Sequence, residues 1–69
     1  MMAGNRVLEI RNKLGLTQVE LAHKLGITQP TISQYELQKA NPSFETCRKI
    51  VKLANAKGIK INIEDVRPD

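Results

Sequence analysis

The clearest structural signal in this 69-residue sequence lies in residues 17–36, which read TQVELAHKLGITQPTISQYE. Thr17 is followed three residues later by Glu20, and at a helix start each of these side chains can bond the backbone N–H of the other. Gly26 is typical of a helix end, because it adopts a left-handed conformation without steric cost. Thr28, two positions further on, can cap the next helix. A link this short predicts two helices that cross steeply.

This geometry is a helix-turn-helix, in which one helix lies across the DNA backbone and supports a second. The major groove of DNA, about 12 Å wide, accepts that second helix, and its first residues meet base edges. Near the start of residues 28–36 the side chains are polar but uncharged, which suits base edges, although they would also fit a solvated face. We therefore expect a recognition helix over residues 28–36 that reads bases through Gln29, Thr31, Ser33 and Gln34.

The residues outside this stretch predict further helices. In residues 5–14 apolar side chains recur at helical spacing, and Gly15 follows as a helix end. Ser43 can cap a longer helix that ends near Gly58. The side chains expected in the core are Val7, Ile10, Leu14, Val19, Leu21, Ala22, Leu25, Ile32, Tyr35, Phe44, Cys47, Ile50, Val51, Leu53 and Ala54.

Residues 59–69 give a mixed signal. Their three isoleucines alternate as in a strand, whereas Asn62 followed by Glu64 and Asp65 is typical of a short capped helix. We expect an extended stretch and then a short helix. Since 69 residues cannot build a second core, the sequence predicts one all-α domain over residues 1–69, a compact bundle of about five short helices.

Composition argues against several function classes. One cysteine, Cys47, cannot form an intramolecular disulfide, and together with one histidine, His23, it cannot build a four-ligand zinc site. We expect Cys47 to be a buried thiol and His23 to be exposed. The sequence offers no catalytic triad, phosphate loop or metal cluster, so we expect neither an enzyme nor a metal, cofactor or small-molecule site. It also lacks the apolar stretches of a membrane span or a signal peptide, which favours a cytoplasmic protein.

The net charge of +4 is unevenly distributed along the chain. Residues 1–60 carry ten Lys or Arg and four Glu, whereas residues 61–69 carry one Arg and three acidic residues. A basic body with an acidic end indicates a polyanionic partner. The charge alone does not choose between nucleic acid, anionic lipid and solubility.

The two central helices resemble a known family. The pattern TQxxLAxxLGITQxTISxYE over residues 17–36, with NPSxET over residues 41–46, resembles the lambda-repressor-like helix-turn-helix family of Cro/repressor type. The resemblance covers about residues 5–66, and the last six residues resemble the end of small prophage regulators. It implies a transcriptional regulator that binds double-stranded operator DNA in a bacterial or phage-infected cell, associated with the nucleoid when bound.

The resemblance also implies roles for individual residues. Gln29 would read a base, most simply adenine through a bidentate amide contact, and Thr31 would contact a phosphate or a thymine methyl. Arg11 and Glu36 would form a structural pair that ties the first helix to the end of the recognition helix. Gln18 would also support the recognition helix. The residues implied at DNA phosphates are Thr17, Gln18, Lys39 and Asn41. The family commonly has glycine where this chain has Leu37-Gln38, so the following loop is expected to differ in course.

One recognition helix covers too few base pairs to find an operator in a genome, so we expect a two-fold dimer that is weak in solution and stronger on DNA. No separate sensor or dimerisation domain is evident, so we expect the dimer contact to be made by the domain itself, at the end of the chain. The dimer candidates are Ile59, Ile61, Ile63 and Val66. The alternative is an antitoxin or protein-interaction adaptor that reuses the helix-turn-helix fold.

Overall fold

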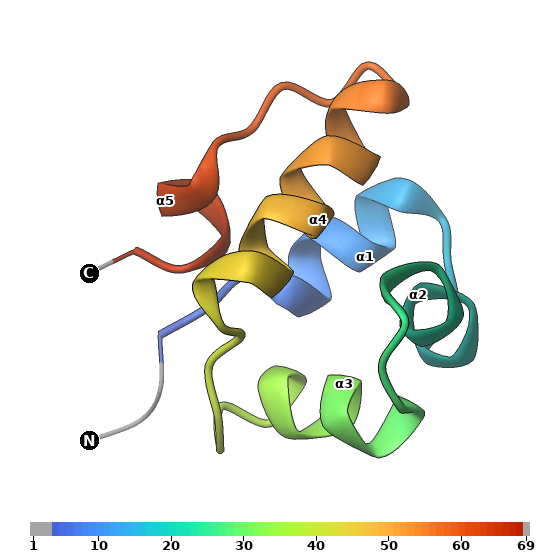
Figure 1. The fold of residues 1–69 in the computed structure, drawn as a ribbon, viewed down its shortest axis with the longest axis vertical. Coiled ribbons are helices and arrows are strands. Elements are labelled where there is room, and N and C mark those ends of the chain that lie inside the picture. Colours follow the sequence, from blue (N-terminus) through green and yellow to red (C-terminus); the bar gives the residue numbers. More distant parts are fainter. Residues whose placement is uncertain (1–3, 69) are drawn as a thin grey trace.

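Five α-helices and no strands make up residues 4–68, the part of the chain that the computed structural model describes (Figure 1). They are α1 (Val7–Leu14), α2 (Gln18–Leu25), α3 (Gln29–Glu36), α4 (Phe44–Ala56) and α5 (Ile63–Val66). The all-α bundle expected from the sequence is confirmed. The short last helix is confirmed as well, and the four residues before it, 59–62, form neither helix nor strand, with an extended backbone at Asn62.

Side chains cap three of the helices as expected. Thr17 and Glu20 form a reciprocal capping box at the start of α2, with bonds of 2.8 and 3.1 Å. Asn62 makes the same arrangement with Asp65 at the start of α5, and Ser43 accepts from the Thr46 N–H at the start of α4. These bonds satisfy N–H groups that lack an acceptor within the helix.

The expected cap at Thr28 is not formed by its side chain. Thr28 is the N-cap residue of α3, with an extended backbone, but its hydroxyl bonds the hydroxyl of Thr31 at 2.8 Å. The first N–H groups of α3 are therefore not satisfied by this side chain. Pro30 lowers the demand for a cap, because its nitrogen carries no hydrogen.

The core draws buried side chains from all five helices and confirms most of the predicted positions. Two were wrong: Val19 is 65% exposed and Phe44 is 63% exposed. The buried residues of α2 are Leu21, Ala22 and Leu25, and Val19 lies outside the face that they form. Phe44 is the first residue of α4, and Pro42 and Cys47 fill that end of the core instead. His23 is exposed and Cys47 is buried, as expected.

The last helix completes the core. Val66 of α5 is fully buried, and the backbone N–H of Arg6 donates to its carbonyl oxygen at 2.8 Å. The segments at the two ends of the described chain therefore lie together, on the same side of the molecule (Figure 1). Within residues 4–68 no helix has the length and apolar character needed to span a membrane.

Candidate nucleic-acid interface

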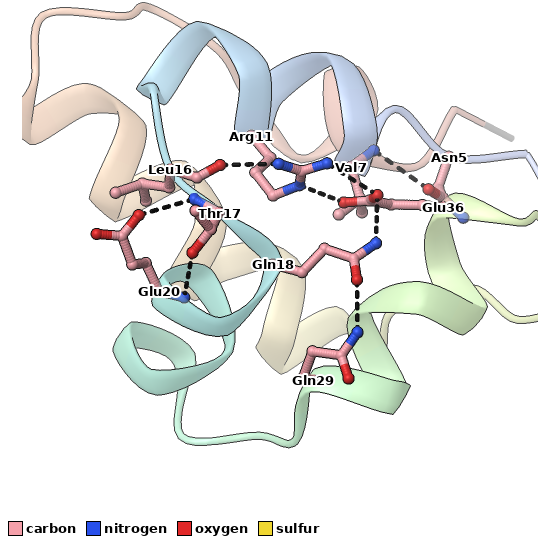
Figure 2. A network of polar contacts seen from close by, with 9 residues as sticks. All are labelled: Asn5, Val7, Arg11, Leu16, Thr17, Gln18, Glu20, Gln29 and Glu36. Carbon is pink, nitrogen blue, oxygen red and sulfur yellow. Dashed lines mark hydrogen bonds and ion pairs between the residues drawn. The ribbon is translucent and has the colours of Figure 1, made fainter.

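Four side chains from three helices form a continuous series of hydrogen bonds, the polar chain, which consists of Arg11, Glu36, Gln18 and Gln29 (Figure 2). Gln29 is the first residue of α3 and Glu36 is the last, so the polar chain contacts this helix at both ends. The connection between them runs through Gln18, the first residue of α2. The orientation of α3 therefore depends on side chains of α1 and α2.

Arg11 and Glu36 form a bidentate ion pair. Arg11 donates from Nε to Oε2 of Glu36 at 2.5 Å and from Nη2 to Oε1 at 3.1 Å, and from Nη1 to the carbonyl oxygen of Leu16 at 2.8 Å. The Arg11 and Glu36 side chains are 15% and 7% exposed. The pair that the family resemblance implied is thus formed and largely buried.

This pair shifts the protonation equilibria of both groups. Burial by itself raises the pKa of the Glu36 carboxyl, but the hydrogen bonds from Arg11 and Gln18 and the Arg11 charge outweigh burial, so that pKa lies below its ordinary value. The hydrogen bond to Glu36 raises the pKa of Arg11. Both groups are charged at neutral pH.

Gln18 joins the ion pair to the start of α3. Its Nε2 donates to Oε1 of Glu36 at 2.8 Å, and its Oε1 accepts from Nε2 of Gln29 at 2.6 Å. Because an amide offers both a donor and an acceptor, Gln18 can be bonded on both sides at once. Gln29 is exposed, so a ligand can still reach its second amide hydrogen and its carbonyl oxygen.

The other predicted base-reading residues lie on the same helix with different exposures. Gln34 is exposed, whereas Ser33 and Thr31 are half-buried. The Thr31 hydroxyl is bonded to Thr28, which fixes it near the start of α3. With Gln29, these residues give α3 a polar surface without charge, which suits donors and acceptors on base edges.

The predicted phosphate contacts lie on two segments beside α3. Thr17 and Gln18 are at the start of α2. Lys39 is exposed in the loop between α3 and α4, and Asn41 is half-buried there. The Oδ1 of Asn41 accepts from Nδ2 of Asn5 at 3.2 Å, a contact that the sequence did not predict.

Two residues hold this loop, Asn5 and Gln38. Nothing in the sequence indicated the role of Asn5, and Gln38 was marked only as a place where the loop was expected to differ in course. Asn5 is 8% exposed, although asparagine is usually found at the surface. Gln38 has a φ of 60°, in the left-handed region that favours glycine. A non-glycine residue just past a helix end was the signal available, because it implies that its side chain does something a glycine cannot.

The predicted dimer residues lie elsewhere in the fold. Ile59, Ile61 and Ile63 are half-buried against the core, on α5 and the segment that leads to it. Val66 was wrongly placed in this set: it is fully buried and offers no surface to a partner. In Figure 1, α3 and α5 lie on different sides of α4. Residues 4–68 contain no group of three or more His, Cys, Asp or Glu that could hold a metal ion.

The chain is similar to known proteins along most of its length. A family model described as helix-turn-helix matches residues 7–59, which include the whole polar chain. An uncharacterized HTH-type transcriptional regulator from Archaeoglobus fulgidus is 41% identical over 61 residues, which span 88% of this chain and 79% of the relative.

Proposed function

Because the chain belongs to the helix-turn-helix family of Cro/repressor type, whose members are DNA-binding transcription regulators, we propose that α3 enters the major groove of an operator and reads its sequence. Gln29 and Gln34 contact base edges through their amides, and Ser33 and Thr31 contribute hydroxyls. Thr17, Gln18, Lys39 and Asn41 contact phosphates on either side of the groove. The protein acts by binding and not by catalysis.

The observation that carries this proposal is the attachment of α3 at both ends. Base reading requires side chains held in fixed places, because a flexible contact loses affinity when it is ordered on binding. The polar chain connects Gln29 and Glu36 to α1 and α2, which limits rotation of α3 about its axis. In this proposal the Gln18 amide takes part in the polar chain and also contacts a phosphate. One side chain therefore links the contact with the DNA backbone to the base contact made by Gln29.

We further propose that the protein binds as a two-fold dimer on a pseudo-palindromic operator. The partly exposed isoleucines Ile59, Ile61 and Ile63 support a contact between copies. They belong to α5 and the segment that leads to it, which lie away from α3 (Figure 1). Their neighbourhood carries both Lys60 and Asp65, so self-pairing there brings opposite charges within reach of each other. A dimer bound to an operator keeps other proteins from binding there, which favours repression. The last six residues resemble the end of small prophage regulators, which favours a regulator that acts in the bacterial cytoplasm.

Titration of mixed-sequence duplex DNA at several salt concentrations tests the proposed function. We expect the binding constant to fall steeply as salt rises, because each neutralised phosphate releases counterions. Duplexes that carry the preferred site should have a binding constant at least about a thousandfold higher than that of the mixture at the same salt concentration. Binding that is absent, or equally strong for every sequence, would contradict a sequence-specific regulator and favour an adaptor that binds proteins.

A further inference from the structure

The loop between α3 and α4, residues 37–43, is attached to the segment that precedes α1. Asn5 Nδ2 lies within hydrogen-bond distance of three oxygens: the carbonyl oxygens of Tyr35 (3.0 Å) and Ala40 (3.1 Å) and Oδ1 of Asn41 (3.2 Å). One carboxamide thus contacts both the last turn of α3 and the loop that follows it. These contacts join residues at least 30 positions apart in the sequence.

Asparagine is specifically suited to this position. Its Oδ1 accepts from the backbone N–H of Val7 at 3.2 Å, at the start of α1, while its Nδ2 donates to the loop. Aspartate would place a second acceptor against the carbonyl oxygens of Tyr35 and Ala40, and alanine would leave these groups without that donor. The side chain therefore links the start of α1 to the end of α3.

Gln38 makes a second attachment. Its Oε1 accepts from the backbone N–H of Asn5 at 3.2 Å, and its Nε2 donates to the carbonyl oxygen of Asn5 at 3.1 Å. The amide thereby pairs with both backbone groups of one residue, as a neighbouring strand would.

This attachment comes at a conformational cost. In residues 4–68 the other residues with positive φ are glycines, which end α1, α2 and α4 or follow their ends: Gly15, Gly26 and Gly58. At the end of α3 the backbone N–H of Gln38 bonds the Tyr35 carbonyl and that of Lys39 bonds the Gln34 carbonyl, the same pattern of turn. Gln38 thus adopts a conformation that disfavours a side chain, and its side chain reaches the Asn5 backbone.

We propose that Asn5 and Gln38 are positioning residues for DNA binding, which hold the loop that carries Lys39 and Asn41 at a fixed place beside α3. The inference rests on the proposed function, in which Lys39 and Asn41 contact phosphates. A loop that is already ordered pays less conformational entropy when it binds the DNA backbone. Since phosphate contacts set the register of a protein on the duplex, the attached loop also places α3 in the groove.

Asn5→Ala and Gln38→Gly separate positioning from stability. Asn5→Ala removes the carboxamide contacts. Gln38→Gly removes the side-chain amide that bonds the Asn5 backbone, but it also removes the cost of holding a non-glycine residue at positive φ. The thermal stability of this variant should therefore stay near that of the wild type. Leu14→Ala is the matched control for stability, because Leu14 is buried at the other end of α1. Asn12→Ala is the control for removing an asparagine carboxamide from an exposed position of α1.

Two quantities are measured for each variant: its affinity for mixed-sequence duplex DNA over a range of salt concentrations, and the rate of hydrogen exchange at the Lys39 amide. The folding of each variant is checked at the same temperature. We expect Asn5→Ala to weaken binding about tenfold and to lower the slope of log binding constant against log salt by about one. Gln38→Gly should change both in the same direction by less. Exchange at Lys39 should speed up relative to the amides of α3, and the control variants should keep the wild-type slope.

A folded Asn5→Ala variant with the wild-type salt slope and wild-type protection at Lys39 would overturn the positioning role. Equal losses in Asn5→Ala and Leu14→Ala, with unchanged slopes, would also overturn it, because stability alone would then explain the effect. A wild-type chain that does not bind duplex DNA would contradict the proposed function itself. That result is distinct from the first two, in which the wild type binds normally.

Discussion

The Glu36 carboxylate accepts hydrogen bonds from side chains of two other helices, Arg11 of α1 and Gln18 of α2. A carboxylate that is largely removed from water needs such partners, because an unpaired buried charge is costly. The Arg11–Glu36 pair therefore stabilises the fold only while both members are present. The same carboxylate fixes the end of α3, so stability and placement of α3 are linked at this residue.

We predict strong coupling between Arg11 and Glu36 in a double-mutant cycle. Arg11→Met or Glu36→Gln alone should lower the free energy of unfolding by about 1–3 kcal/mol, because each leaves the other group poorly paired. The double change should cost less than the sum of the two. Chemical denaturation measures the cycle. The exposed pair Glu9–Lys13, at 3.7 Å, is the control and should couple by less than about 0.5 kcal/mol. Additive losses at Arg11 and Glu36 would contradict the role of the pair.

We also predict that acid weakens the contribution of Glu36 to stability. Its pKa in the folded chain is lowered, so the ionised form stabilises the fold above the unfolded pKa of about 4.3. That contribution is lost as the pH falls through the folded pKa. The free energy of unfolding of the wild type should therefore fall towards that of Glu36→Gln as the pH falls below about 4.3. Parallel pH curves for the two proteins would contradict this account.

Gln29 and Lys39 should have different effects on DNA binding. Gln29→Ala should cost about 1–3 kcal/mol on the best site and relax the preference at one base pair, because it removes a base contact. Lys39→Ala should weaken all sequences about equally and lower the salt slope by about one, because it removes a phosphate contact. Titrations of specific and mixed-sequence duplexes compare them. A loss for Gln29→Ala that is as large on mixed DNA as on the best site would refute base reading.

The sequence predicted the helices well because their ends carry local signals. Thr17 and Glu20, three residues apart, were sufficient to place the start of α2. Periodicity was less reliable for the core, because it did not show that Val19 lies off the packed stripe and Phe44 at an open helix end. The attachment of Asn5 to the loop after α3 was not predicted, since its partners are distant in the sequence and belong to no repeated pattern.

The two threonines that precede α2 and α3 provide a test of capping. Thr17→Ala should destabilise the chain by about 1 kcal/mol, because the backbone N–H of Glu20 loses its acceptor. Thr28→Ala should cost less, because the Thr28 hydroxyl bonds a side chain and not the backbone. Thermal or denaturant unfolding compares the two variants. The reverse order would show that Thr28 caps α3 in solution.

The proposed dimer sets the form of the operator. Two recognition helices related by a two-fold axis lie about 34 Å apart and meet half-sites centred about 10 base pairs apart. In this proposal the contact is made by the isoleucines at 59, 61 and 63, which are half-buried, and not by Val66, which is buried.

Footprinting tests this arrangement. We expect two protected half-sites on one face of the duplex, and we expect Ile61→Asp to weaken their joint occupancy while a single half-site still binds. Glu64→Lys, at an exposed position of α5, is the control for a charge change on the same segment. One asymmetric half-site protected by a single chain, unaffected by Ile61→Asp, would exclude the dimer.

Selection of bound duplexes from random DNA shows whether α3 reads DNA sequence in the major groove. The wild type should enrich one short motif, and Gln29→Ala should lose the preference at one position of each half-site while it keeps the rest. Methylation of adenine at N6 within the motif, which blocks a major-groove contact, should weaken wild-type binding. The absence of an enriched motif after selection would contradict base reading by α3. So would an identical motif for the wild type and Gln29→Ala, together with wild-type binding that this methylation does not weaken.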